Sequence, residues 1–282
     1  MDILDKAWNF ALSGRRPREQ GKKTVCSDEE SHQSLTLPLG HSKNGTAIPK
    51  QRRQMSLTPE LVALCERPES DPGPNPNFTP VGPAELDVLR ERLLGQLGDQ
   101  ALWLFAYGSL IWNPNFAFVE QRRGTIHGWH RSFCLELTRW RGSPQQPGLM
   151  MALEGGGSCD GVVFRLPNGD HREHIRNLVG REITTREDLV MVRWATVRTD
   201  TGPVRALVFW AGPKGDGISS KLPLERVAWV LARACGHVGS CASYLYNTVA
   251  KLEACGIHDR NLWRLQELVA EEIHKFRNED FA

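Results

Sequence analysis

The chain has no long hydrophobic run, no paired-cysteine motif and no excess of charge of either sign. Its 282 residues contain no stretch of about 18 apolar residues, so the sequence offers no membrane-spanning helix. The seven cysteines are scattered without a CxxC pair, which favours a reducing, cytoplasmic location over a disulfide framework. A net charge of +2 gives no broad field for nucleic acid or an anionic membrane. We therefore expect a cytoplasmic protein with neither a nucleic-acid nor a membrane partner.

Signatures of several common catalytic sites are missing too. There is no GxSxG elbow, no Walker loop and no GxGxxG motif. Two histidine pairs, His127/His130 and His171/His174, have i, i+3 spacing. The first lies in a strand-like region, where this spacing puts the two rings on opposite faces, and the second has no third ligand nearby. We therefore expect no metal site.

The first 80 residues differ in composition from the rest of the chain. Residues 27–53 have few aliphatic side chains, and residues 68–80 are rich in proline. A short helix is predicted where Thr58 is an N-cap followed by proline. We expect residues 1–80 to form a largely disordered extension and linker. Residues 81–282 then form the folded domain.

The predicted elements of residues 81–282 are strands first and helices last. A leucine stripe begins at Leu86 and predicts a helix that ends near Leu97. Strands are predicted at residues 101–106, 124–134 (with a bulge at Gly128), 189–197 and 204–210. A hairpin is predicted at residues 149–166, with its tip at 154–160. Helices are predicted after Asp170 and at residues 224–235, 240–255 and 259–276. This order indicates an α+β fold.

A glycine turn directly behind a buried strand is the first candidate for chemistry. The apolar run 101–106 is followed by Tyr107-Gly108-Ser109-Leu110-Ile111-Trp112. Where such a strand breaks, successive backbone N–H groups can point outwards together and attract an anion. The pattern predicts a site for a small substrate that carries a carboxylate, although an ordinary turn fits the same residues.

A catalytic base near this loop is the second requirement. Glu182 lies between the predicted short helix and a strong strand, where a carboxylate can face a cavity while its backbone stays rigid. The alternative, which spacing alone favours, is a surface ion pair of Glu182 with Arg181 or Arg186. Both interpretations stay open.

The order of the motifs resembles that of the ChaC-type γ-glutamylcyclotransferases. Residues 102–114, centred on Tyr107 to Trp112, are similar to the N-terminal signature of that family. Further segments follow in the same order as in the family: residues 128–133, 147–153, 161–166, Arg181–Glu182 and 236–245. The resemblance covers roughly residues 102–276, and the N-terminal extension has no counterpart in it.

The resemblance implies a γ-glutamylcyclotransferase-like fold, with a mixed β-barrel flanked by helices, in residues 81–282. It implies a lyase that cleaves a small γ-glutamyl peptide, chiefly glutathione, to 5-oxoproline and cysteinylglycine. Glu182 would be the catalytic acid/base, and Tyr244 would line the pocket. The γ-glutamyl head would be held by Tyr107, Gly108, Ser109, Leu110, Ile111 and Trp112. Because the substrate's own amine attacks, no metal or organic cofactor is expected.

One departure from the family pattern concerns the residues after the proposed base. The family usually has Gly-Tyr a few residues beyond its glutamate, and residues 183–190 contain no tyrosine. Two alternatives therefore stay open: a protein that binds γ-glutamyl ligands without turnover, and a cyclotransferase for other γ-glutamyl amines. The sequence fixes neither the exact substrate nor the oligomeric state.

Overall fold

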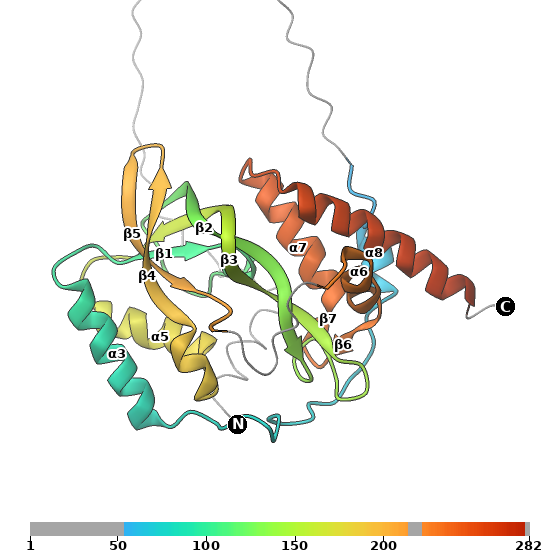
Figure 1. The fold of residues 1–282 in the computed structure, drawn as a ribbon, viewed down its shortest axis with the longest axis horizontal. Helices are drawn as coiled ribbons and strands as arrows, with labels where there is room; N and C mark the ends of the chain where they lie inside the picture. The colour runs from blue at the N-terminus through green and yellow to red at the C-terminus, as the bar shows by residue number, and fades with distance from the viewer. Residues whose placement is uncertain (1–53, 214–221, 280–282) are drawn as a thin grey trace, which may run out of the picture.

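The structure is a computed structural model that describes residues 54–213 and 222–279. The expectations for residues 1–53 lie outside these described residues. A closed β-barrel with the strand order β1-β3-β2-β4-β5 forms the centre (Figure 1). Its strands are β1 (Trp103–Ala106), β2 (Glu120–Leu137), β3 (Gly148–Arg165), β4 (Val192–Thr199) and β5 (Gly202–Phe209).

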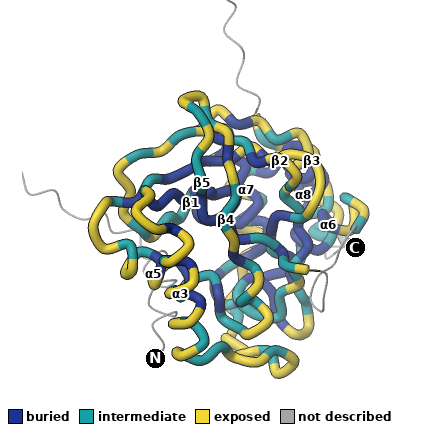
Figure 2. The backbone as a smooth tube through the Cα atoms, turned by 60° about the vertical axis from the view of Figure 1, so that its left-hand side comes forward, coloured by how far each residue is buried: buried dark blue, intermediate teal, exposed yellow. Residues whose placement is uncertain are grey.

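The barrel is mixed, as the family resemblance implied. Strand β1 runs parallel to β5, whereas the other neighbouring pairs are antiparallel. All four residues of β1 are buried, which agrees with the apolar run predicted there. Because β1 and β5 run in the same direction, the loop after Ala106 emerges at the barrel end where β5 finishes. Figure 2 shows the buried backbone gathered around β1, with exposed stretches at the periphery.

The hairpin expected around residues 154–160 is wrong. Strand β3 continues through this glycine-rich segment and pairs with β2 on both sides of it. Gly156 and Gly157 take φ values of 108° and 73° inside the strand, and Gly128 on β2 takes 82°. Glycine adopts this region without a steric penalty, so the segment bends a long ribbon instead of reversing the chain. The bulge predicted at Gly128 is confirmed by a register shift between His127 and Trp129.

Two helices lie together on one side of the barrel. Helix α3 (Pro83–Leu97) packs against α5 (His171–Glu182), as Figure 1 shows. The predicted leucine stripe is confirmed, since Leu89, Leu93 and Leu97 are buried. Helix α5 begins at its predicted cap, where the Asp170 side chain accepts a hydrogen bond from the Glu173 N–H. A short 3₁₀ helix, η1 (Glu187–Val190), leads from α5 to β4.

Three helices close the chain on the other side of the β2–β3 ribbon (Figure 1). They are α6 (Leu224–Arg233), α7 (Cys241–Ala254) and α8 (Arg260–Glu279), which pack on one another. The predicted ends of α7 are confirmed: Ser240 is the N-cap, and Gly256 follows with a φ of 71°. Two short strands, β6 (Cys235–Gly236) and β7 (Gly239–Ser240), lie between α6 and α7.

Part of the expected N-terminal extension is packed on these helices. Helix α2 (Pro59–Ala63) starts behind the predicted cap Thr58, whose side chain accepts from the Leu61 N–H. Leu57 is completely buried, and its N–H donates to Gln266 Oε1 of α8 at 2.8 Å. Residues 54–67 therefore contribute to the folded unit, in contrast to the disorder expected for them. The domain boundary at residue 80 stays a prediction.

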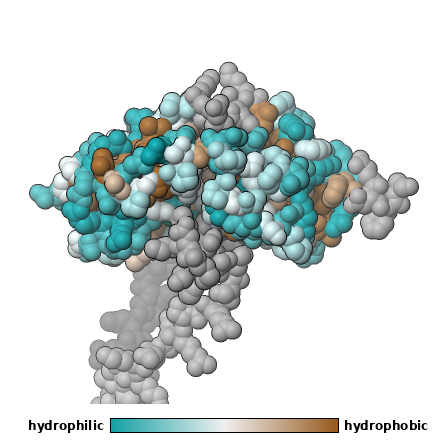
Figure 3. Space-filling view, turned by 90° about the horizontal axis from the view of Figure 1, so that it is seen from below, coloured by the Kyte–Doolittle hydropathy of each residue, from teal (hydrophilic) through white to brown (hydrophobic). Residues whose placement is uncertain are grey.

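The outer face drawn in Figure 3 is mainly hydrophilic, with small and separate hydrophobic patches among the coloured residues. In the part of the chain that the structure describes, no helix combines the length and the apolar character needed to cross a membrane.

Candidate active site

The predicted glycine loop leaves the end of β1 and turns at once into a single helical turn, α4 (Ser109–Trp112). A Cβ atom added to Gly108 would lie 2.7 Å from Tyr244 Oη, so no larger residue fits without a shift. Leu110 and Ile111 are buried, whereas Ser109 is partly exposed. The two apolar side chains therefore anchor the loop, while Ser109 stays partly accessible to solvent.

Helix α7 holds this loop at two points one helical turn apart. The Ser109 N–H donates to Tyr244 Oη at 3.4 Å, and Trp112 Nε1 donates to Thr248 Oγ1 at 3.0 Å. The Trp112 and Tyr244 rings meet edge to face, with centroids 5.7 Å apart. The structure thus brings together the loop and Tyr244, which are 135 residues apart in sequence.

A buried arginine fixes the start of the loop. Arg131 Nε donates to the Tyr107 carbonyl at 3.2 Å. Its other nitrogens contact the Asp259 carboxylate and the Asp160 carbonyl, and its side chain is only 4% exposed. This three-way contact joins β1, the β2–β3 ribbon and the start of α8. Arg131 therefore holds the backbone at the start of the loop in place.

Glu182 is the last residue of α5, and a neighbouring arginine connects it to the loop. Arg181 Nε lies 3.0 Å from Glu182 Oε1, and Arg181 Nη1 donates to the Asn113 carbonyl at 2.7 Å. Asn113 directly follows α4. The Glu182 side chain is 23% exposed. The ion pair with Arg181 that the sequence allowed is present, and it lies at the end of the loop.

The Glu182 carboxylate interacts electrostatically with both tyrosines. Burial raises the pKa of Glu182, and Asp188 adds to this effect, while Arg181 opposes it. Burial also raises the pKa of Tyr244 to about 12 and that of Tyr107 well above its usual 10. The negative charge of Glu182 contributes to both of these increases. The site thus combines two neutral phenols with one carboxyl group whose proton affinity is increased.

Residues 183–190, which follow Glu182 and depart from the family pattern, are held by hydrogen bonds within the segment itself. The Asp188 carboxylate accepts from the N–H groups of Thr184 and Thr185 at 2.9 and 2.8 Å.

Among the described residues, no group of three or more His, Cys, Asp or Glu side chains is placed to hold a metal ion.

The sequence interpretation missed Arg141, which lies behind the site. Its guanidinium carbon is 5.8 Å from the Trp112 ring centre and 5.7 Å from that of Tyr244. An arginine inside the glycine- and proline-rich stretch 140–148 was the signal that could have identified it, because such loops often position functional side chains.

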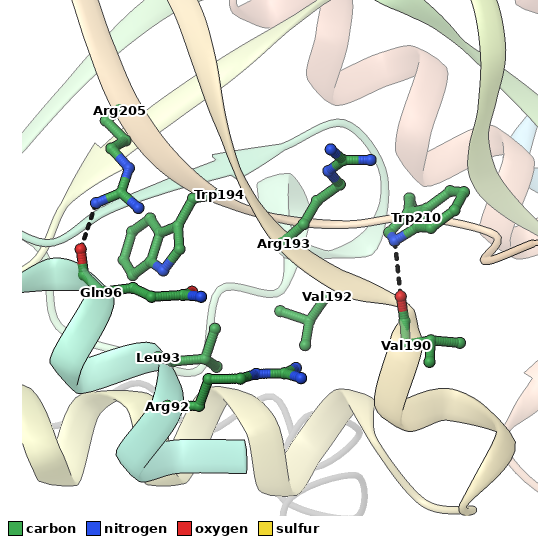
Figure 4. A pocket seen from close by; sticks show the side chains of 9 residues that line it. All are labelled: Arg92, Leu93, Gln96, Val190, Val192, Arg193, Trp194, Arg205 and Trp210. Atoms are coloured by element: carbon green, nitrogen blue, oxygen red, sulfur yellow. Dashed lines mark hydrogen bonds between the residues drawn. The ribbon is translucent and has the colours of Figure 1, made fainter.

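A separate hollow of about 520 Å³ lies between α3 and the strands β4 and β5 (Figure 4). Arg92 and Gln96 reach into it from α3, whereas Trp194 and Arg205 come from the facing strands. None of the residues expected to bind or turn over a substrate lines this hollow, so it is distinct from the candidate active site.

The fold and the glycine loop define a class of protein. A solved γ-glutamyl cyclotransferase specific to glutathione, from yeast, superimposes with a TM-score of 0.55. The match covers 62% of this chain and 98% of the yeast protein, at 20% sequence identity. The barrel and its flanking helices therefore have the γ-glutamylcyclotransferase-like fold, as the resemblance implied.

Sequence comparison gives the family within that class. A family model described as ChaC-like protein matches residues 102–272. A glutathione-specific γ-glutamylcyclotransferase of Escherichia coli is 38% identical over 57% of this chain and 69% of its own length. The mouse glutathione-specific γ-glutamylcyclotransferase 1 is 32% identical over 56% of this chain and 73% of its own. The chain belongs to the ChaC-like protein family.

Proposed function

We propose that this protein is a γ-glutamylcyclotransferase that converts glutathione to 5-oxoproline and cysteinylglycine. The names of the E. coli and mouse relatives support both the reaction class and the substrate. The observation that carries the proposal is the contact of Glu182 with the loop through Arg181, whose Nε lies 3.0 Å from Glu182 Oε1 and whose Nη1 donates to the Asn113 carbonyl at 2.7 Å.

The loop from Tyr107 to Trp112 is proposed to hold the γ-glutamyl head. Ser109 and Trp112 are partly exposed, and the Ser109 backbone N–H donates to Tyr244 Oη. An anionic group of the substrate could replace or share that weak contact at 3.4 Å. Tyr244 would then donate a hydrogen bond from its hydroxyl group to the substrate, because its phenol stays neutral at physiological pH.

The reaction needs one proton to move between two nitrogens. The α-amine of the γ-glutamyl residue attacks its own γ-carbonyl carbon, forming the lactam C–N bond. The bond from that carbon to the cysteinyl nitrogen then breaks. Glu182 is proposed to accept the proton of the attacking amine and to deliver it to the departing nitrogen. A carboxyl group with a raised pKa suits this double task, since proton transfer is efficient when the pKa approaches the working pH.

Alignment of the substrate's amine with its own γ-carbonyl carbon accounts for the rest of the proposed rate enhancement. An aligned intramolecular attack corresponds to an effective molarity of about 10⁵–10⁸ M. The loop is fixed from both sides, by Arg131 and by α7, and can therefore select the folded substrate conformer.

The test of the proposed role is the substitution Glu182→Gln, with Glu187→Gln as the matched control. Glu187 is an exposed acid five residues further on. We expect Glu182→Gln to lower kcat for 5-oxoproline release from glutathione by about 10²-fold or more, and Glu187→Gln to leave it unchanged. Near-normal product release by Glu182→Gln would refute the role. Tight glutathione binding by the wild type without any product would favour the alternative of a binding protein. Products from other γ-glutamyl amines but not from glutathione would favour the other alternative.

A cytoplasmic location is proposed as well. Six cysteines of the described residues carry free thiols: Cys65, Cys134, Cys159, Cys235, Cys241 and Cys255. Free thiols in this number are typical of a reducing compartment, where glutathione is abundant in its thiol form.

A further inference from the structure

Arg141 is a buried cation with unused hydrogen-bonding capacity. It is 7% exposed, and its Nη1 donates to the Ser240 carbonyl at 2.7 Å and to Ser243 Oγ at 3.1 Å. Its Nε is buried without a partner. None of the ion pairs formed by residues 54–213 and 222–279 includes Arg141. Two of its three guanidinium nitrogens thus have no acceptor in the described protein.

The backbone around Arg141 is rigidly packed. The Cys241 Sγ–H donates to the Arg141 carbonyl at 3.1 Å. A Cβ atom on Gly148 would lie 2.7 Å from that carbonyl, and one on Gly142 would lie 2.2 Å from the Leu137 carbonyl. The loop therefore accepts only glycine at these positions. This close packing gives Arg141 one fixed position beside the site.

The charge of Arg141 is left without a carboxylate in direct contact. Glu66 is the acid that acts on it through space, but the Glu66 oxygens accept from Ser240 N at 3.1 Å and from Ser240 Oγ at 2.7 Å. Burial lowers the pKa of Arg141, yet an arginine guanidinium stays charged in proteins. A buried cation without a contacting anion is costly, and an anionic ligand would offset that cost.

The guanidinium of Arg141 lies beside the candidate active site. Nη1 is directed to Ser240 at the start of α7, whereas the guanidinium lies beside the rings of Trp112 and Tyr244. These two rings belong to the predicted substrate-binding set. An arginine fork suits a carboxylate because two parallel N–H donors match its two oxygens.

We propose that Arg141 is a specificity-determining residue that binds a carboxylate of the substrate through the nitrogens that Ser240 and Ser243 leave free. This inference rests on the proposed function. Glutathione offers two carboxylates, one on the γ-glutamyl α-carbon and one on the terminal glycine. The same fork would hold either of them.

The experiment measures ligand binding by calorimetry in the Glu182→Gln background, where no turnover consumes the ligand. Three ligands are compared: glutathione, glutathione amidated at its α-carboxylate, and glutathione amidated at its glycine carboxylate. Arg141→Gln is the test variant, and Arg92→Gln, an exposed arginine at the separate hollow, is the control.

We expect Arg141→Gln to weaken glutathione binding by about 10- to 100-fold, the usual loss for a charged hydrogen bond. The loss should vanish for one of the two amides, and that amide identifies the carboxylate that Arg141 holds. Unchanged glutathione binding would overturn the proposal. An equal loss for all three ligands would also overturn it, because a structural defect does not depend on one carboxylate.

Arg141→Lys covers the case in which Arg141→Gln does not fold. It keeps the charge and most of the packing but lacks the planar fork, so it should weaken glutathione binding and spare the same amide. The readout is independent of catalysis. If the wild type released no 5-oxoproline, the proposed function would fail while this binding comparison still gave its answer.

Discussion

The two walls of the candidate site are built differently. The loop wall, residues 107–112, is held by α7 through Tyr244 and Thr248 and by Arg131 from behind. The Glu182 wall, at the end of α5, is connected to that loop through Arg181. The loop wall is closely packed and mostly uncharged, whereas the Glu182 wall contains charged groups, Arg181 and Asp188, that act on the pKa of Glu182. Under the proposed function, recognition of the substrate therefore depends on packing, and proton transfer depends on electrostatics.

Apart from Glu182→Gln, the largest effect is expected from a substitution that disrupts the loop wall. Gly108→Ala places a methyl group 2.7 Å from Tyr244 Oη, so either the loop or Tyr244 must move. We expect kcat/KM for glutathione to fall by about 10²-fold, as displacements near 1 Å do in active sites. Gly95→Ala on α3, where an added Cβ meets nothing within 4 Å, should leave kcat/KM unchanged.

A second substitution sharpens this prediction. Removing the hydroxyl with Tyr244→Phe in the Gly108→Ala background should recover part of the melting temperature, because the clashing atom is gone. A double variant that is no more stable than Gly108→Ala alone would show that the close approach is not what constrains Gly108.

A smaller effect is expected when the charged wall is altered. Arg181 lowers the pKa of Glu182, so Arg181→Met should raise that pKa further. If the carboxylate form is the base, the acidic limb of the pH profile of kcat/KM then moves to higher pH. We expect a loss of about 10-fold at neutral pH and a smaller loss under alkaline conditions. A uniform loss at every pH would assign Arg181 a purely structural role.

The two walls differ in what could be predicted from sequence. The buried strand, the glycine break and the caps of α5 and α7 follow local rules, and these predictions are confirmed. The hairpin tip predicted at residues 154–160 is wrong, because glycines with positive φ values occur in a bent strand as well as in a turn. Whether a carboxylate faces a cavity or solvent depends on contacts distant in sequence. The pairing of Arg181 with the Asn113 carbonyl, 68 residues away, is one of them.

The positions of Arg141 and of residues 54–67 also depend on contacts that the local sequence does not predict. The composition of residues 140–148 makes Arg141 a candidate, but its place beside Trp112 and Tyr244 depends on contacts distant in sequence. The composition of the first 80 residues suggested disorder, yet Leu57 and Val62 provide enough apolar surface to dock on the helices. Both outcomes are set by tertiary packing.

The smallest effect concerns stability and follows from the raised pKa of Glu182. Its folded-state pKa exceeds the usual 4.5, so the folded protein binds this proton more tightly than the unfolded chain. The carboxylate therefore costs stability above its folded pKa, and the cost disappears as the pH falls below about 4.5. We expect Glu182→Gln to gain a few degrees in melting temperature relative to the wild type at pH 8, and less at pH 4, below the usual pKa of 4.5. A gain that was the same at both pH values would contradict the raised pKa.

The most direct test of the central claim is incubation of the wild-type chain and its Glu182→Gln variant with glutathione, with detection of cysteinylglycine. The account predicts stoichiometric cysteinylglycine and 5-oxoproline from the wild type and a trace from the variant, at equal glutathione affinity. Equal product formation by both proteins would contradict it.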